Sequence, residues 1–221
     1  MTFDPMPFWV SFQLGFCTTI LLFPVSLLLA WGLTRSKGSW TVWVEPVFSL
    51  PLVVSPTVLG FYLLIFLSPS GPVGHFFVST LGLRLAFSFP GIVLASCLSS
   101  LPFFLAPMKA GFSALPESLW EASYTLGKGP ITTLAKVILP NLKPALLAGI
   151  VSCFAHTLGE FGVVLMVGGS IPGVTKVVSI AIFEQVEALN FSQAQVYSAV
   201  LVIVGYTGVF LMNQVIQRKK P

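Results

Sequence analysis

Charged residues are scarce in this sequence. Only 8% of its 221 residues are Asp, Glu, Lys or Arg, whereas 55% are hydrophobic. Soluble domains usually carry about 25% charged residues, and no polar stretch here is long enough to enclose a core of its own. The composition therefore argues against a large soluble domain and predicts a single polytopic membrane domain over residues 1–221.

Motifs for catalysis and nucleotide binding are also missing. The sequence contains no G-x-x-x-x-G-K-[ST] phosphate loop, no H-E-x-x-H zinc motif and no G-x-S-x-G nucleophile elbow. Its three cysteines, Cys17, Cys97 and Cys153, lie in apolar segments without C-x-x-C spacing, which favours packing over a metal or disulfide set. We therefore expect a protein without catalytic residues, resident cofactor or metal, and without an ATPase site of its own. The N-terminus lacks the basic region of a signal peptide, so we expect the first span to be retained.

Charge-free intervals divide the chain into candidate membrane spans. A helix needs about 20 apolar residues to cross the hydrocarbon core. Five intervals are long enough: 8–33, 46–67, 85–108, 141–168 and 190–216. Residues 74–83 are apolar but interrupted by glycine and too short to span, so a sixth, partial helix is left open there. The predicted fold class is an all-α polytopic membrane protein with five transmembrane helices, or six with that partial one.

Lys and Arg are distributed unevenly between the loops. If the N-terminus lies outside, the loops after the first and third spans and the C-terminal tail carry nine of the eleven: Arg35, Lys37, Lys109, Lys128, Lys136, Lys143, Arg218, Lys219 and Lys220. The outer loops carry the other two, Arg84 and Lys176. Because cytoplasmic loops are enriched in Lys and Arg, we expect the N-terminus outside and the C-terminus in the cytoplasm. Topology then explains the positive charge, and nucleic-acid binding is not needed to explain it.

The predicted cytoplasmic loop at residues 113–140 has helical patterning of its own. Its apolar stripe consists of Leu115, Leu119, Ala122 and Leu126. Glu117 and Glu121 lie on the polar side near the start of this helix, and the run from Gly127 to Pro130 predicts its end. A second short helix is predicted over residues 131–139, ending at Pro140. Such a loop is suited to docking onto a partner. The alternative is a helix lying on the bilayer, which would more often carry Lys and Arg than two glutamates.

The same loop resembles a known family motif. Glu121-Ala122-Ser123, Gly127 and Ile138-Leu139-Pro140 are similar to the EAA loop of ABC importer permeases, which reads Glu-Ala-Ala, then glycine four residues later, then hydrophobic-Leu-Pro. Ser123 stands where the family has its second alanine. In that family the loop is the coupling helix, which sits in a groove on the cytoplasmic ATPase. The resemblance implies this coupling role for Glu117, Glu121, Ala122, Ser123, Gly127, Ile138, Leu139 and Pro140.

Polar residues inside the third and fourth spans are candidates for a transport pathway, because polar groups in a bilayer are costly and usually functional. The third span carries Ser96, Ser99 and Ser100 on one face; the fourth carries Ser152, His156 and Gly159 on one face, with Thr157 and Glu160 nearby. Hydroxyls without a mid-span Lys or Arg would hydrogen-bond an oxyanion without trapping it, so tight capture would belong to a separate outer protein. The alternative is that the serines serve helix packing.

Glu160 is the charged residue expected deepest in the bilayer. A carboxylate at that depth must be paired or protonated. Because a carboxylate is a poor ligand for an anion, we expect Glu160 to be a gate or packing residue. His156, one turn earlier, is the expected hydrogen-bond partner.

A second resemblance covers nearly the whole chain. His156 to Gly162 reads HTLGEFG and Gly169 to Thr175 reads GSIPGVT, similar to the molybdate and tungstate branch of ABC permeases. His156 and Ser170 depart from that branch, which has Arg and Asn there. Residues 50–62 also look like its second span. The resemblance places Phe161 and Gly162 among the pathway or gate candidates. Sulfate and thiosulfate permeases have a similar Gly-Glu-Phe-Gly passage, so they stay open as an alternative.

These resemblances imply the fold of a type I ABC importer permease in the inner membrane. Two copies would line one path at their interface, in contact with lipid, and two cytoplasmic ATPase subunits would receive the coupling helices and bind ATP. A periplasmic or extracellular binding protein would deliver the oxyanion. Ion-coupled secondary carriers are a further alternative, but they tend to show internal repeats and paired intramembrane charges. A non-transporting scaffold would not explain the polar faces of the spans.

Overall fold

The computed structural model describes residues 4–36, 38–39 and 41–217, and every regular element in these ranges is helical. The elements are α1 (Met6–Arg35), α2 (Thr41–Val53), α3 (Pro56–Leu67), α4 (Pro72–Leu81), α5 (Phe89–Ser113), α6 (Glu117–Thr125), α7 (Pro130–Thr133), a π-helical turn (Leu134–Ile138), α8 (Leu139–Asn141), α9 (Lys143–Gly159), α10 (Gly162–Gly168), α11 (Val178–Glu187) and α12 (Phe191–Gln217). The all-α prediction is confirmed for this part of the chain. Four of the cations used to predict orientation lie outside the described residues: Lys37, Arg218, Lys219 and Lys220.

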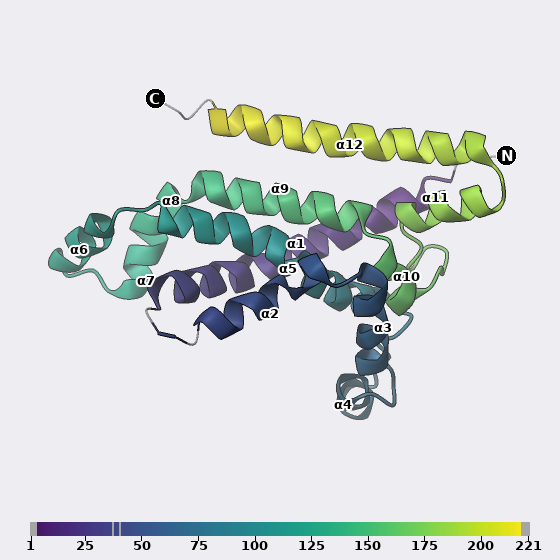
Figure 1. The fold of residues 1–221 in the computed structure, drawn as a ribbon, viewed down its shortest axis with the longest axis horizontal. Coiled ribbons are helices and arrows are strands. Elements are labelled where there is room, and N and C mark those ends of the chain that lie inside the picture. The colour runs from purple at the N-terminus through teal and green to yellow at the C-terminus, as the bar shows by residue number, and fades with distance from the viewer. Residues whose placement is uncertain (1–3, 37, 40, 218–221) are drawn as a thin grey trace.

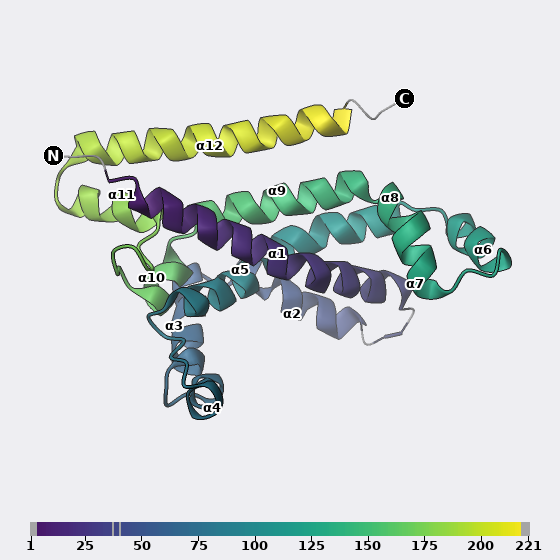
Figure 2. The same ribbon diagram turned by 180° about the vertical axis from the view of Figure 1, so that it is seen from behind.

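The long helices α1, α5, α9 and α12 run roughly along the long axis of the molecule (Figures 1 and 2). At one end lie α6, α7 and α8, together with the end of α12. At the opposite end lie α10, α11 and the start of α1. Helices α3 and α4 project sideways from this bundle (Figure 1). The segment predicted to dock and the segment predicted to face outside are therefore at opposite ends.

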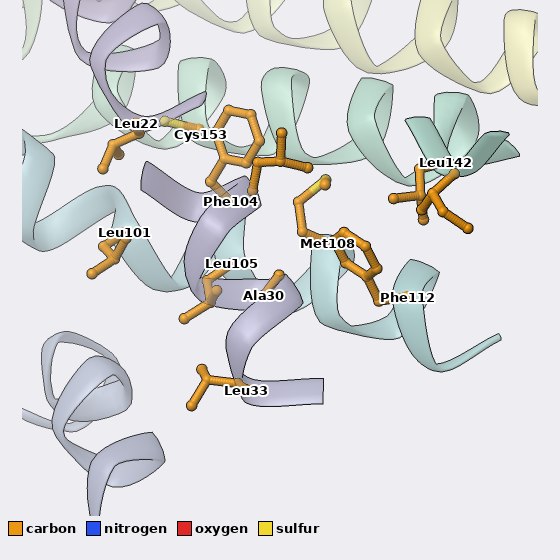
Figure 3. Close-up of a cluster of buried hydrophobic side chains, with 12 residues drawn as sticks. Leu22, Ala30, Leu33, Leu101, Phe104, Leu105, Met108, Phe112, Leu142 and Cys153 are labelled. Atoms are coloured by element: carbon orange, nitrogen blue, oxygen red, sulfur yellow. The ribbon is translucent and has the colours of Figure 1, made fainter. Parts of the chain in front are cut away.

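The main core forms where α1, α5 and α9 pack together (Figure 3). Phe104 and Met108 of α5 are completely buried there, beside Ala30 of α1 and Cys153 of α9. Gly149 allows this packing, because a Cβ at that position would lie 2.8 Å from the Phe104 ring. Cys153 thus has the packing role predicted for it: it is a free cysteine, and its sulfur accepts a hydrogen bond from the Thr19 hydroxyl at 3.7 Å.

Two of the predicted spans are not continuous helices. Among the described residues, three helices are long and apolar enough to cross a membrane, and the number rises to five if two bent pairs each count as one span. The bend between α2 and α3 is 111°, within the predicted span 46–67. Ser55 is extended there because the following Pro56 disfavours a helical conformation. The predicted span 141–168 breaks at Glu160 and Phe161, between α9 and α10.

Two shorter segments also refine the sequence predictions. Residues 72–81, overlapping the stretch left open as a sixth helix, form α4, which ends at the left-handed Gly82. The helix predicted to end at Pro140 instead continues to Asn141 and begins at Pro130. A π turn precedes Pro140, in which the Leu139 N–H bonds to the Leu134 carbonyl. Beyond Asn141 the chain bends by 77° into α9.

Candidate functional site

The end of α6 is shaped by Gly127. Its φ of +71° lies in the left-handed region that glycine adopts without strain. The Gly127 N–H donates to the Tyr124 carbonyl at 2.9 Å and the Lys128 N–H donates to the Ser123 carbonyl at 3.1 Å. This pair of bonds is the Schellman motif that commonly ends helices. The helix end predicted from Gly127 to Pro130 is therefore confirmed.

Ser123, the departure from the family motif, has a specific contact. Its side chain is buried, and its hydroxyl is 2.8 Å from the Thr133 hydroxyl. Thr133 in turn donates to the Gly129 carbonyl at 3.0 Å. Ser123 therefore links α6 to α7 through a hydrogen bond between two hydroxyls, which an alanine could not form. Sequence reasoning treated this residue only as a small substitute for alanine.

The other residues predicted to couple fall into two groups. Glu117, Glu121, Ala122 and Pro140 are exposed. Ile138 is completely buried in the main core, and Leu139 packs partly against it. The motif thus combines surface residues available to a partner with apolar residues that anchor the loop. A cavity of about 450 Å³ lies beside the two glutamates, between α6 and the last turns of α1 and α5.

Glu160 lies at the break between α9 and α10. Its side chain is 7% exposed, and its Oε2 accepts a hydrogen bond from the Ser99 hydroxyl at 2.6 Å. Its backbone carbonyl accepts a hydrogen bond from the Ser179 hydroxyl at 2.7 Å. One residue therefore joins α5, α9 and α11. The predicted pairing with His156 is wrong, because the chain leaves the helix at Glu160 and its side chain points to α5 instead.

His156 has partners of its own. Its Nδ1 is 3.0 Å from the Ser100 hydroxyl, and its ring stacks on Phe103 with centroids 3.8 Å apart. The Ser100 hydroxyl is also 2.9 Å from the Thr157 hydroxyl. The hydroxyls of Ser99 and Ser100 thus join α5 to α9, which favours the packing alternative for these two. Ser96 is buried and its hydroxyl has no hydrogen-bond partner within the described structure, whereas Ser152 is half-buried.

Removing the Ser99 hydroxyl should weaken the contact between α5 and the end of α9. In Ser99→Ala, Glu160 loses its donor from α5, so we expect stability to fall by about 0.5–2 kcal/mol, the range of interhelical polar contacts in membranes. Thermal unfolding of the detergent-purified protein, followed by circular dichroism, measures this. Ser79→Ala is the matched control, since the exposed Ser79 bonds only to a carbonyl of its own helix. Equal melting temperatures for both variants would contradict the assignment.

A cavity connects the two helix breaks. It measures about 520 Å³ and is lined by Pro56, Thr57, Ala155, His156, Gly159, Glu160, Phe161 and Gly162. A Cβ on Gly162 would lie 2.9 Å from the Pro56 Cβ and 3.2 Å from the Thr57 nitrogen, so glycine permits the close approach of α10 to α3. Five of the predicted pathway residues therefore border one space. Pro56 and Thr57 were not predicted to line this cavity, although Pro56 is itself a local signal for the break between α2 and α3.

The turn between α10 and α11 is closed by polar contacts. Thr175 donates to the Gly168 carbonyl at 2.7 Å, and the Ile171 N–H donates to Thr175 at 3.1 Å. Glu184 of α11 accepts from Ser170 and forms an ion pair with Lys176. Partial burial of Glu184 opposes its ionisation, but these hydrogen bonds and the charge of Lys176 prevail and lower the pKa of Glu184.

The lowered pKa predicts a pH-dependent turn. A carboxyl whose pKa is depressed by folding stabilises the folded state above its ordinary pKa, and this contribution disappears as pH falls through the lowered value. We expect amide exchange of residues 174–176, whose N–H groups bond to the Ile171 carbonyl, to accelerate below about pH 4 relative to the trend of free peptides. Hydrogen exchange read by mass spectrometry measures this. In Glu184→Gln the additional acceleration should be absent; its persistence would rule out this pair as the cause.

The chain is similar to known transport proteins over most of its length. A family model described as "Binding-protein-dependent transport system inner membrane component" matches residues 23–220. The molybdenum transport system permease protein ModB of Azotobacter vinelandii is 40% identical over 204 residues, covering 92% of this chain and 90% of that protein. The sulfate transport system permease protein CysT of Salmonella typhimurium is 29% identical over 204 residues, covering 92% of this chain and 73% of that one.

Solved structures resemble the fold. A chain of a bacterial ABC transporter that imports the acidic polysaccharide alginate matches with a TM-score of 0.77 at 17% identity, covering 98% of this chain and 79% of that chain. A chain of the inward-facing MetNI methionine ABC transporter matches with a TM-score of 0.73 at 16% identity, covering 97% of this chain and 95% of that chain. At these identities the likeness concerns the fold alone.

Proposed function

This chain belongs to the family of binding-protein-dependent transport system inner membrane components, and we propose that it is the permease subunit of an ATP-driven importer for molybdate. The observation that carries the cargo is the 40% identity to the molybdenum permease over 92% of the chain, against 29% for the sulfate permease. The chain is a transport subunit rather than an enzyme. Tungstate, a tetrahedral dianion of nearly the same size, would share the path.

The proposed mechanism is mechanical. Two copies of the chain form the pathway at their interface, and two ATPase subunits bind ATP and receive α6 through Glu117, Glu121 and Ala122. Closure of the ATPase pair moves the two α6 helices and switches the path between inward and outward access. A binding protein delivers the oxyanion at the end of the molecule that carries α10 and α11. In this proposal the start of α1 faces outside and α6 lies in the cytoplasm, which agrees with their positions at opposite ends of the molecule in Figure 2.

The pathway proposal rests on the cavity at the two helix breaks. Its polar lining consists of Thr57, His156 and Glu160 together with the backbone around Gly159, and none of the described residues that line it is Lys or Arg. An oxyanion could accept hydrogen bonds there from Thr57, His156 and the backbone without being held by a fixed positive charge, whereas Glu160 would be a gate residue and not a ligand. The surface that faces lipid and the surface for the second copy must both be apolar. Two helix faces meet that condition, because they carry exposed aromatic residues: Trp9, Phe12 and Phe16 on α1, and Tyr206 and Phe210 on α12.

Competition between oxyanions tests the cargo. The permease is reconstituted in lipid vesicles with its ATPase and binding protein, and labelled molybdate is taken up in the presence of excess tungstate or sulfate. We expect tungstate to compete and sulfate to have no effect. Suppression by sulfate would keep the importer and move its substrate to the sulfate branch, as the second candidate function.

A further inference from the structure

Arg35, in the last turn of α1, contacts two aromatic rings of α6. Its guanidinium carbon lies 4.7 Å from the centre of the Trp120 ring and 5.9 Å from that of Tyr124. Its Nη1 also donates a hydrogen bond to the Tyr124 hydroxyl at 3.0 Å. One turn earlier on α1, the Trp31 ring stacks on Trp120, with centroids 6.5 Å apart and planes 5° from parallel. Long side chains thus tie the end of α1 to the helix proposed to dock on the ATPase.

The other end of α1 contacts the opposite end of the molecule. Its 30 residues make a rod of about 45 Å at 1.5 Å per residue, and Figure 2 shows it running from α11 toward α7. Near its start, the Ser11 hydroxyl accepts a hydrogen bond from the Val178 N–H at 2.8 Å, at the first residue of α11. The neighbouring Ser179 is the residue that donates to the Glu160 carbonyl at 2.7 Å.

These contacts form a continuous connection from α6 to the helix break. We propose that Arg35 is a positioning residue that fixes α6 to α1, so that a displacement of α6 is carried along α1 to α11 and Glu160. The inference rests on the proposed function, because it assigns a task to α1 in the same transport cycle. Movement of α6 would then reach the helix break at Glu160 by two routes. One runs through α7 and α9, and the other runs through α1 and α11.

The chemistry of the contact requires arginine. The planar guanidinium stacks on aromatic faces while donating in its own plane, which a lysine ammonium does not reproduce. A residue needed only to set membrane orientation would be replaceable by lysine, since the distribution of Lys and Arg together sets topology. Arg35→Lys therefore separates the two roles. Tyr124→Phe tests the hydrogen bond separately, because it removes the hydroxyl and keeps the ring.

The experiment compares transport with hydrolysis in the reconstituted complex. For Arg35→Gln we expect molybdate uptake per ATP hydrolysed to fall by about fivefold or more, the effect of losing a cation–π contact and a hydrogen bond. The KM for ATP should not change, because the nucleotide site lies in the partner. Arg35→Lys should restore only part of the loss. The double variant Arg35→Gln/Tyr124→Phe should transport no worse than Arg35→Gln alone. Tyr124→Phe removes only the hydrogen bond to Arg35, which Arg35→Gln has already removed. Arg84→Gln, which removes an exposed arginine that is not in this contact, is the matched control.

Two outcomes would overturn the inference. One is that the contact has no role that needs arginine, which an unchanged uptake per ATP in Arg35→Gln and full restoration by Arg35→Lys would each show. The other is a loss of uptake that is matched by a loss of assembled complex, which would make the contact merely structural. Failure of the proposed function is read separately, from the wild-type complex: uptake that needs no ATP would refute that function whatever the Arg35 variants do.

Discussion

Reversing the charge of Glu121 should abolish molybdate uptake while the permease still inserts and folds. Glu121 is exposed on α6, and its carboxylate forms no hydrogen bond or ion pair within the described residues. Glu121→Lys therefore removes nothing that holds the chain together. It places a lysine on the surface proposed to enter the ATPase groove. A groove that is complementary to a carboxylate would present like charge to this lysine, and such a juxtaposition costs several kcal/mol. Uptake in reconstituted vesicles, normalised to the permease present in the membrane, measures the effect.

Gly127→Val is a second test of the same surface. With φ at +71°, a β-branched side chain is strained there although the space around it is open. The Schellman bonds at the end of α6 should be lost, and the coupling surface with them. Glu121→Gln is the matched control for Glu121→Lys, since it removes the carboxylate charge at the same exposed position without introducing a positive one. Normal uptake by both Glu121→Lys and Gly127→Val would refute the coupling assignment.

Gly162→Val should strongly slow transport through the helix breaks. The added Cβ would lie 2.9 Å from the Pro56 Cβ and 3.2 Å from both the Pro56 carbonyl carbon and the Thr57 nitrogen. Two of these atoms belong to the backbone at the start of α3, so no side-chain rotation can relieve the contact. Overpacking of this kind costs about 1–3 kcal/mol, and it would separate α10 from α3 at the proposed pathway. We expect initial uptake to fall by about tenfold or more, corresponding to at least 1.4 kcal/mol.

The control for this variant is Gly32→Val. Gly32 is an exposed glycine of α1 at which an added Cβ meets nothing within 4 Å. Gly162→Ala should lie between wild type and Gly162→Val, because it adds the Cβ but not the two methyl groups. If Gly162→Val transports at the wild-type rate, α3 and α10 do not need this close contact, and the cavity at the breaks is not the pathway.

Local patterning predicted α6 well and the spans only in part. The spacing of Leu115 to Leu126 and the glycine at 127 are signals within one helix, so they can be read from the sequence. Hydropathy counts apolar residues over a window and does not detect a short break within it. The break before Pro56 had a local signal in the proline itself. The break at Glu160 had none, because glycines on either side also occur in continuous membrane helices.

Side-chain pairings between distant helices were the part that sequence could not supply. The expected pairing of Glu160 with His156 assumed that both residues lie on one continuous helix. Ser99, the actual partner, is 61 residues away on α5. The sequence indicated Arg35 only as one of the cations that predict membrane orientation. Nothing in the sequence of α1 indicates that the Arg35 guanidinium lies over the Trp120 ring. In each case the contact depends on how helices pack, which helical periodicity alone does not determine.

ATP dependence of molybdate uptake is the most direct test of the account. The permease, its ATPase and its binding protein are reconstituted in vesicles with an ATP-regenerating system or with a non-hydrolysable analogue. We predict that labelled molybdate accumulates only with hydrolysable ATP, and that the Glu121→Lys permease accumulates none. Uptake that proceeds without ATP, and that follows an imposed ion gradient instead, would show that the chain is an ion-coupled carrier and that α6 is not a coupling helix.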